Sequence, residues 1–315
     1  MKKYFKLGLL LITVLFNQKA MATLAPELSA PIEGRWDLTV NMGEGRVGAS
    51  WLEVRHSGIK TLIGTFVGDG GSARPVAQVF FKDGKVNFHI PTQWDMSEKE
   101  MFFEAELKDE KLVGTIVTPS GKTYTITGVR APNLISDKIP VWGKPIQLFN
   151  GKNLDGWQAL GKTNQWVVDN GVLKSPRSGA NFRTIKTFDD FKLHIEFRYP
   201  KESNSGVYLR GRYEVQVEDS KGREPLSIYL GGIYGFIDPL FMMAKEAGEW
   251  QSFDITLVGR VVTVAVNGKT VIHQQQIPGV TGGALDSNEG APGPIMIQGD
   301  HGPVEYRNII ITPAK

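Results

Sequence analysis

The chain has 315 residues, of which 41% are hydrophobic and 22% are charged, with 36 glycines, no cysteine and a formal net charge of +3. This composition is that of a globular protein, and the length is sufficient for two domains of ordinary size. The lack of cysteine excludes a disulfide framework and a lipid-modified cysteine, and the small net charge argues against a basic nucleic-acid-binding protein.

The first 22 residues have the pattern of a secretory signal peptide. A lysine-rich start precedes an apolar run at residues 7–16, and small residues at 20–22 suit cleavage after Ala22. The run is too short for a membrane anchor, and no later stretch reaches the roughly 18 apolar residues that a membrane-spanning helix needs. We therefore expect a periplasmic or secreted protein without a membrane anchor, and loss of the four signal-peptide lysines changes its net charge to −1.

Residues 32–130 predict a small antiparallel β domain. Short strands with one apolar face follow one another, as at Trp36, Leu38 and Val40, and turn sequences such as 82–85 and 108–111 separate them. A meander of this length closes most economically into a barrel, because closure removes exposed strand edges. The alternative is a short open sheet packed on the second domain.

A proline-rich linker follows at residues 131–145. It contains Pro132, Pro140 and Pro145, which cannot donate hydrogen bonds to a strand ladder. We place the domain boundary here and expect the two domains to be separable at this point.

Residues 146–315 again predict strand after strand. Val262, Val264 and Val266 alternate just before a hairpin turn at Asn267 and Gly268. Many strands with one apolar and one polar face, spread over roughly 170 residues, favour two packed antiparallel sheets, a jelly-roll β-sandwich.

Three successive strands of this second domain carry charged and amide groups on their polar faces. Their common alternation predicts that the three faces share one sheet surface. Such a surface suits carbohydrates, because a hydroxyl-rich ligand needs many fixed donors and acceptors. The alternative is a solvated face with weak ion pairs. The residues concerned are His194, Glu196, Arg198, Tyr208, Arg210, Glu214, Gln216 and Glu218.

The loop at residues 298–303 concentrates an amide, an acid and a base in Gln298, Asp300 and His301. Histidine titrates near neutral pH, so His301 is the strongest candidate for a proton carrier or metal ligand. The alternative is that Asp300 only fixes the loop by bonding its own backbone. No HExxH or GxSxG motif supports a metalloprotease or a serine hydrolase.

Five segments of the second domain resemble, in order, the 3-keto-disaccharide hydrolase domain family of secreted bacterial proteins. The segments are LFNGKNLDGW at 148–157, NSGVYLRG at 204–211, YEVQ at 213–216, GEW at 248–250 and QGDHGPVEYRNI at 298–309. The resemblance covers residues 146–315 and implies a concanavalin-like lectin/glucanase sandwich, in agreement with the strand pattern. The family's GIYG stretch is kept at 232–235, whereas residues 227–229 depart from the family pattern, so substrate selection is expected to differ there.

The resemblance implies an exported enzyme that cleaves 3-keto-glycosides or 3-keto-disaccharides. A ketone at C3 makes the C2 proton acidic, so one base can remove it while an electrophile holds the enolate and the C1 leaving group departs. Hydration then completes a net hydrolysis without the usual pair of glycosidase carboxylates. The alternative function is a non-catalytic, lectin-like carbohydrate-binding protein on the same fold.

The same resemblance suggests roles for individual residues. Glu214 or His301 is the expected base, with Glu214 preferred because a strand holds a side chain more rigidly than a loop. Arg210 and Gln216 are expected to donate to the enolate or to hydroxyl groups, and a divalent metal held by His301 and Glu214 is the alternative electrophile. The expected substrate-binding residues are Asn204, Tyr208, Arg210, Gln216, Tyr234, Gln298 and Asp300.

Overall fold

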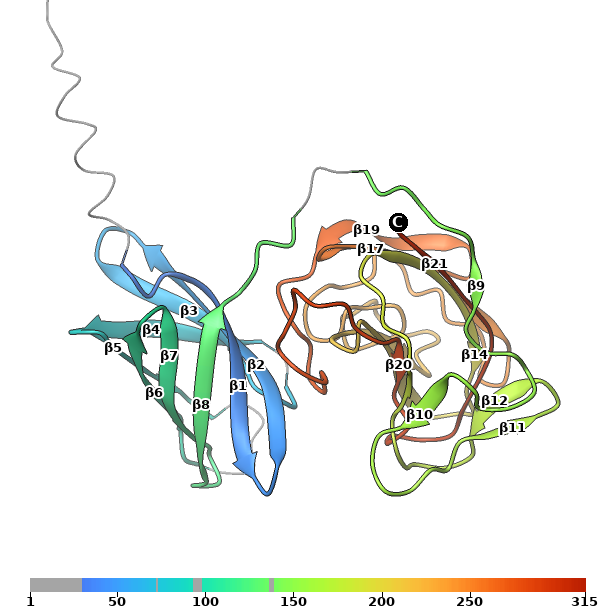
Figure 1. Cartoon of the computed structure of the whole chain (residues 1–315), viewed down its shortest axis with the longest axis horizontal. Helices are drawn as coiled ribbons and strands as arrows, with labels where there is room; N and C mark the ends of the chain where they lie inside the picture. Colours follow the sequence, from blue (N-terminus) through green and yellow to red (C-terminus); the bar gives the residue numbers. More distant parts are fainter. Residues whose placement is uncertain (1–29, 72, 93–97, 136–138) are drawn as a thin grey trace, which may run out of the picture.

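The computed structural model describes residues 30–71, 73–92, 98–135 and 139–315, so the predicted signal peptide lies outside the described residues. Within these ranges every regular element is a β-strand, and no helix is long and apolar enough to cross a membrane. Figure 1 shows two bodies side by side, a barrel drawn in blue to green and a sandwich drawn in green to red. The predicted all-β class is confirmed.

The first body is a closed antiparallel barrel of eight strands. Each strand pairs with its neighbour in sequence, and the last strand closes the barrel by pairing with the first. The closed barrel is confirmed over the open sheet. The strands are β1 (Gly34–Gly43), β2 (Arg46–Ser57), β3 (Thr61–Val67), β4 (Arg74–Lys82), β5 (Lys85–Ile90), β6 (Met101–Lys108), β7 (Lys111–Val117) and β8 (Thr123–Arg130).

Turn chemistry and alternation explain the barrel. The β4–β5 hairpin turns at Asp83 and Gly84, with φ of 52° and 78°, as a tight two-residue turn requires. Trp36, Leu38 and Phe88 lie on inward positions and are fully buried in the barrel's own apolar core.

The second body is a sandwich of two sheets. One sheet has five strands in the order β10 (Trp157–Ala159), β13 (Phe182–Thr184), β20 (Met296–Ile297), β15 (Asn204–Leu209) and β16 (Tyr213–Glu218). The other has the order β11 (Val167–Asp169), β12 (Val172–Ser175), β21 (Val304–Pro313), β14 (Phe191–Arg198), β17 (Gln251–Val258), β18 (Val261–Val266) and β19 (Lys269–Gln276), and β9 (Ile146–Gln147) pairs with β21. The apolar faces of the two sheets bury one continuous cluster between them.

The prediction that three polar strand faces share one surface is wrong. Strand β14 lies in the eight-stranded sheet, whereas β15 and β16 lie in the five-stranded sheet. Because the sheets pack with their apolar faces together, their polar faces point to opposite sides of the sandwich. Alternation reveals which side chains point away from the core, but not the sheet in which a strand lies.

The barrel packs directly on the sandwich through strands β2 and β3. Ala49, Trp51 and Val67 point out of the barrel and belong to the same apolar cluster as the sandwich core. The Trp51 ring lies 5.9 Å from the ring of Phe236, centroid to centroid. Separation of the two bodies would expose this apolar surface, and separability of the domains remains a prediction.

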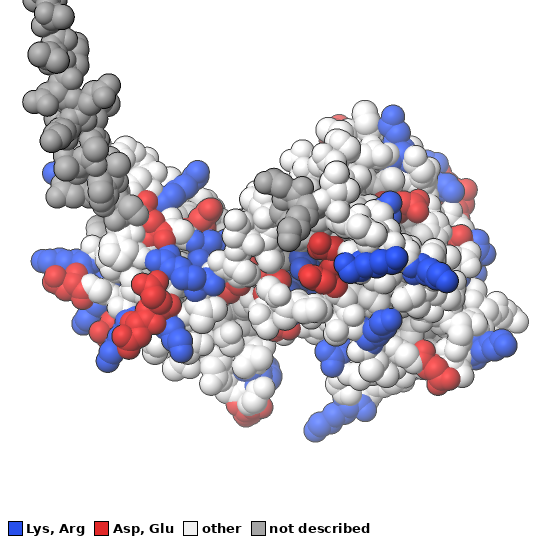
Figure 2. Space-filling model, turned by 45° about the horizontal axis from the view of Figure 1, so that its top comes forward, with Lys and Arg blue, Asp and Glu red and all other residues white. Residues whose placement is uncertain are grey.

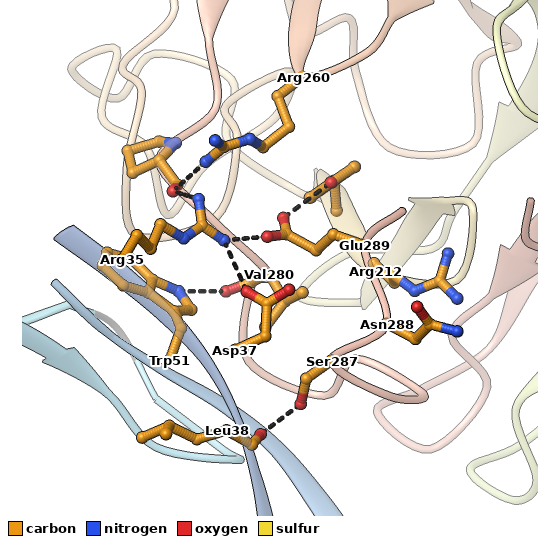
Figure 3. A network of polar contacts seen from close by, with 12 residues as sticks. Arg35, Asp37, Leu38, Trp51, Arg212, Arg260, Val280, Ser287, Asn288 and Glu289 are labelled. Atoms are coloured by element: carbon orange, nitrogen blue, oxygen red, sulfur yellow. Dashed lines mark hydrogen bonds and ion pairs between the residues drawn. The ribbon is translucent and has the colours of Figure 1, made fainter. Parts of the chain in front are cut away.

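Polar contacts surround this apolar contact (Figure 3). Arg35 of the barrel donates to the carboxylate of Glu289 and to the carbonyl of Pro278, and Ser287 donates to the carbonyl of Leu38. Burial, together with the neighbouring Glu289, raises the pKa of Asp37 to about 8. Figure 2 shows acidic and basic side chains mixed over both bodies on the face drawn, so charges of both signs share that face.

Candidate active site

A pocket of about 240 Å³ opens on the outer face of the five-stranded sheet, next to the barrel. This volume is below the roughly 300–1,000 Å³ of pockets for drug-sized ligands, so it suits a small ligand or one part of a larger ligand. The lining residues are Gly70, Asn181, Asn204, Tyr208, Glu214, Gln216, Tyr234, Gly282, Gly283, Gln298, Asp300 and His301.

The pocket brings together eight of the nine residues that the sequence predicted for the site. Strands β15 and β16 supply the four residues between positions 204 and 216. The loop after β16 supplies Tyr234, and the segment after β20 supplies the three residues between positions 298 and 301. These eight are Asn204, Tyr208, Glu214, Gln216, Tyr234, Gln298, Asp300 and His301.

Arg210 does not line this pocket, against the prediction. Strand β15 ends at Leu209, and Arg210 has a φ of 53°, which takes its side chain out of the strand alternation. Its buried guanidinium donates to Asp189 at 3.0 Å and to the carbonyl of Gly259. Arg210 therefore links the loops that contain Asp189 and Gly259 at the end of the sheet.

Glu214 lies on the floor of the pocket, opposite Tyr208 of the adjacent strand. Its side chain packs over Gly206, where any Cβ would overlap the carboxyl group. Glu214 is only 3% exposed, and this burial raises the pKa of its carboxyl to about 8. At neutral pH the carboxyl is therefore mostly protonated.

The hydroxyl of Tyr208 links Glu214 to the pocket wall. It lies 2.9 Å from Oε2 of Glu214 and 3.0 Å from the carbonyl oxygen of Gly282. The hydroxyl has one hydrogen, and its donation to Oε2 of Glu214 leaves Oε1 as the glutamate oxygen that can carry the carboxyl proton. Burial keeps the pKa of Tyr208 well above its ordinary value, so this residue stays a donor.

Asp300 and His301 form a hydrogen-bonded pair at the rim of the pocket. Nδ1 of His301 lies 2.7 Å from Oδ1 of Asp300. This bond raises the pKa of His301 above its usual value, although partial burial opposes the rise, and it lowers the pKa of Asp300. Because Nδ1 is held by the carboxylate, Nε2 is left to accept a proton.

Two buried amides in the pocket have unsatisfied oxygens. The side-chain oxygens of Gln216 and Gln298 have no hydrogen-bond partner among the described residues. Gln216 uses its amide nitrogen to donate to the carbonyl of Ile228 at 3.1 Å. An unpaired buried acceptor costs about 1–3 kcal/mol, so both oxygens are suited to accept from ligand hydroxyl groups.

Sequence reasoning missed four lining residues, Gly70, Asn181, Gly282 and Gly283. The Gly282–Gly283 pair was the available signal, because adjacent glycines permit close backbone approach. Asn181 accepts from the backbone N–H of Gly299 at 2.8 Å and so holds the loop that carries Asp300. Gly70 belongs to the barrel, and nothing in its local sequence connects it to this pocket.

Larger depressions lie elsewhere: one of about 450 Å³ beside Arg198 and Glu305, one of about 470 Å³ beside Asp37 and Ser287, and two of about 360 and 350 Å³ beside His194. The first two are lined by no histidine, and the two beside His194 contain no deeply buried carboxyl. Within the described part of the chain no group of three or more histidine, aspartate or glutamate side chains is arranged to hold a metal ion. A metal bound by His301 and Glu214 would therefore need further ligands of another kind.

Comparison with protein families matches residues 144–312 to a family described as the 3-keto-alpha-glucoside-1,2-lyase-like domain. A curated protein from Bacteroides thetaiotaomicron, named 3-keto-disaccharide hydrolase, is 24% identical over 167 residues. The alignment covers 41% of this chain and 57% of that protein.

Two solved structures are similar to just over half of the chain. A candidate glycosyl hydrolase from Parabacteroides distasonis is 29% identical with a TM-score of 0.47, covering 56% of this chain and 92% of that one. A second candidate glycosyl hydrolase from the same organism is 20% identical with a TM-score of 0.46, covering 54% and 94%.

Proposed function

Because this chain belongs, through residues 144–312, to the 3-keto-alpha-glucoside-1,2-lyase-like domain family, we propose that it is an enzyme that cleaves glycosides whose sugar carries a ketone at C3. The observation that most supports this proposal is the convergence, in one pocket, of the Asp300–His301 pair and the buried acid Glu214. Binding alone needs no such combination of a base and an acid with raised pKa values.

His301 is the proposed base. A C3 ketone acidifies the C2 hydrogen, and Nε2 of His301 takes that proton while Asp300 holds the other ring nitrogen. The electron pair of the C2–H bond forms a double bond between C2 and C3, and the π electrons of the carbonyl move onto the C3 oxygen, which gives an enolate. The raised pKa of Glu214 moves the preference away from this carboxyl as base, because a carboxyl with a pKa of about 8 carries its proton at neutral pH.

Glu214 is the proposed electrophile in place of Arg210. A protonated carboxyl in a buried site donates a strong hydrogen bond to a developing oxyanion. The Tyr208 hydroxyl donates to Oε2 of Glu214 at 2.9 Å and so orients the carboxyl, whose proton on Oε1 is the one offered to the enolate. The unpaired oxygens of Gln216 and Gln298 hold the hydroxyl groups of the ring.

Elimination and hydration then complete the reaction. The C1–O bond breaks, its electron pair leaves with the aglycone oxygen, and that oxygen takes up the proton held by His301. The sugar now has a double bond between C1 and C2 conjugated to the C3 ketone. Water adds its oxygen to C1, a proton returns to C2, and the sum of the steps is hydrolysis.

Incubation of the purified protein with a 3-keto-glucoside and with its unoxidised parent tests the reaction. We expect release of the aglycone from the keto sugar only, because the parent lacks the acidic C2 hydrogen. Equal release from both compounds would indicate a conventional glycosidase. Saturable binding of the keto sugar with no release would indicate the lectin-like alternative.

We also propose that the protein is exported through its predicted signal peptide. N-terminal sequencing of protein recovered from the periplasm or the medium is expected to begin at Thr23. Recovery of the chain from the cytoplasm with Met1 intact would contradict export.

A further inference from the structure

Residues 278–284, here called the shared segment, run between the barrel and the pocket. On the barrel side, the indole N–H of Trp51 donates to the carbonyl of Val280 at 3.0 Å (Figure 3). The backbone N–H of Gly283 donates to the carbonyl of Asp69 at 2.8 Å. Strand β2 and the loop between β3 and β4 therefore hold this segment.

The opposite side of the shared segment contacts strands β15 and β16 around Tyr208 and Glu214. The backbone N–H of Glu214 donates to the hydroxyl of Thr281 at 3.0 Å. The Tyr208 hydroxyl lies 3.0 Å from the carbonyl of Gly282, and the Thr281 backbone N–H donates to the carbonyl of Arg212 at 2.9 Å. The segment thus fixes both strands at the point where the tyrosine and the glutamate meet.

No free space separates these layers. A Cβ at Gly279 would lie 2.5 Å from Nε1 of Trp51, and a Cβ at Gly283 would lie 2.6 Å from the Tyr208 hydroxyl. A Cβ at Gly282 would lie 3.1 Å from the backbone of Gly70. Because real Cβ atoms rarely tolerate such distances, a shift of the barrel surface must displace the segment and the groups beneath it.

We propose that the barrel is a working part of the active site, in which Trp51 and the Asp69 backbone position the shared segment against Tyr208 and Glu214 while Gly70 forms a wall of the pocket. The consequence for catalysis rests on the proposed function, whereas the consequence for the surroundings of Glu214 does not. Trp51 and Asp69 touch no substrate in this scheme and act only through the segment.

The proposal makes the environment of Glu214 depend on the barrel. A loosened segment admits water to the carboxyl, which favours its charged form and lowers its pKa from about 8 toward the ordinary 4.5. Neither test variant below replaces another titratable group that faces Glu214. These groups are Tyr208 on β15, Tyr234 in the loop after β16, Asp300 and His301 in the loop after β20, and Tyr306 on β21.

Two matched substitutions in the full chain test the proposal. Trp51→Phe removes the indole donor to Val280, and Trp36→Phe removes an equally buried indole that donates at 2.9 Å to Ile32 within the barrel. Carbon-13 NMR of the glutamate carboxyl groups, with Glu214→Gln to assign the signal, gives the pKa of Glu214 in each variant. We expect Trp51→Phe to increase the acid dissociation constant of Glu214 at least about tenfold, and Trp36→Phe to leave it unchanged.

A second variant decides the question if Trp51→Phe does not fold. Gly282→Ala presses a methyl group against the backbone of Gly70 and is expected to shift the same titration in the same direction. An unchanged titration in the folded variant, or an equal shift in Trp36→Phe, would overturn the proposal. The titration needs no substrate, so an inactive protein with the expected shift would reject the proposed function and keep this inference.

Discussion

Each outer face of the sandwich carries a histidine–aspartate pair with the same hydrogen-bond distance. On the eight-stranded sheet, Nδ1 of His194 lies 2.7 Å from Oδ1 of Asp254, and near the five-stranded sheet, Nδ1 of His301 lies 2.7 Å from Oδ1 of Asp300. Only the second pair shares a pocket with a deeply buried carboxyl, that of Glu214. A hydrogen-bonded histidine–aspartate pair is therefore not by itself sufficient to identify an active site.

The glutamates on the two faces differ in what covers them. Glu196 on β14 is partly exposed and accepts from Arg307 at 2.6 Å and from Asn308 at 2.8 Å. Partial burial would raise the pKa of Glu196, but these hydrogen bonds outweigh it and leave the pKa below its usual value. Glu214 on β16 lies under the shared segment, and burial raises its pKa to about 8. The protonation state of a glutamate on a strand therefore depends on how deeply its carboxyl is buried, and strand alternation does not reveal this.

The largest expected effect is on the rate of C2 proton exchange, where substitution of the two histidines should have different results. His301→Ala is expected to lower the rate of C2 proton exchange by about 10²- to 10⁴-fold, because the variant lacks the base. His194→Ala removes an equivalent side chain from the opposite face and is expected to leave the rate unchanged. Deuterium incorporation at C2 of a 3-keto-glucoside, followed by NMR, measures both, and normal exchange in His301→Ala would exclude His301 as the base.

Glu214→Gln is expected to slow the same exchange less than His301→Ala, by about tenfold, because the amide still donates a hydrogen bond to the enolate. Loss of exchange in Glu214→Gln, together with normal exchange in His301→Ala, would reverse the two roles. Glu214 would then be the base that the sequence alone favoured.

The two glutamates are also expected to change stability with pH in opposite directions. The pKa of Glu214 is about 8 in the folded protein and 4.5 ordinarily, so its contribution is complete below pH 4.5 and is lost as pH rises toward 8. The loss reaches about 1.4 kcal/mol per pH unit. Glu214→Gln should make the free energy of unfolding depend less on pH in this range. Some dependence should remain, because the pKa of Asp37 is also raised to about 8.

Urea unfolding between pH 5 and pH 8 measures this dependence. Glu196→Gln serves as the control, because the lowered pKa of Glu196 stabilises the protein at neutral pH and loses that contribution only in acid. Equal slopes in the wild type and in Glu214→Gln would show that the carboxyl is not buried in solution.

A smaller effect is expected from the barrel wall of the pocket. A Cβ at Gly70 meets nothing within 4 Å, so Gly70→Leu adds a side chain at the pocket without an internal clash. We expect the KM for 3-keto-glucosides with bulky aglycones to rise about tenfold, with little change for small aglycones. Gly68→Leu alters the same loop outside the pocket lining, and an equal effect there would contradict the role of Gly70.

The smallest effect is expected on the solvent-facing sheet. Glu196→Gln breaks the ion pair with Arg307 and is expected to cost about 0–1 kcal/mol of unfolding free energy, as partly exposed ion pairs do. Aglycone release should stay at the wild-type rate. The midpoint of urea unfolding at neutral pH measures the change, and a large loss of activity would give this face a catalytic role.

The sequence by itself determined what depends on near neighbours in the chain. The barrel could be predicted because each of its hairpins joins adjacent strands, so alternation and turns such as Asp83–Gly84 contain the information needed. The segments around 204–216, 232–235 and 298–301 likewise contain the eight predicted residues that line the pocket.

Only the tertiary structure decided the rest. Strand β14 pairs with β21, so its sheet depends on a contact between distant parts of the chain, and no local pattern reveals it. The positive φ of Arg210 points its side chain away from the predicted surface. Gly70 lines the pocket although it belongs to the other domain. The proton on Glu214 depends on burial beneath a segment that the barrel holds in place, and burial is a property of the assembled fold.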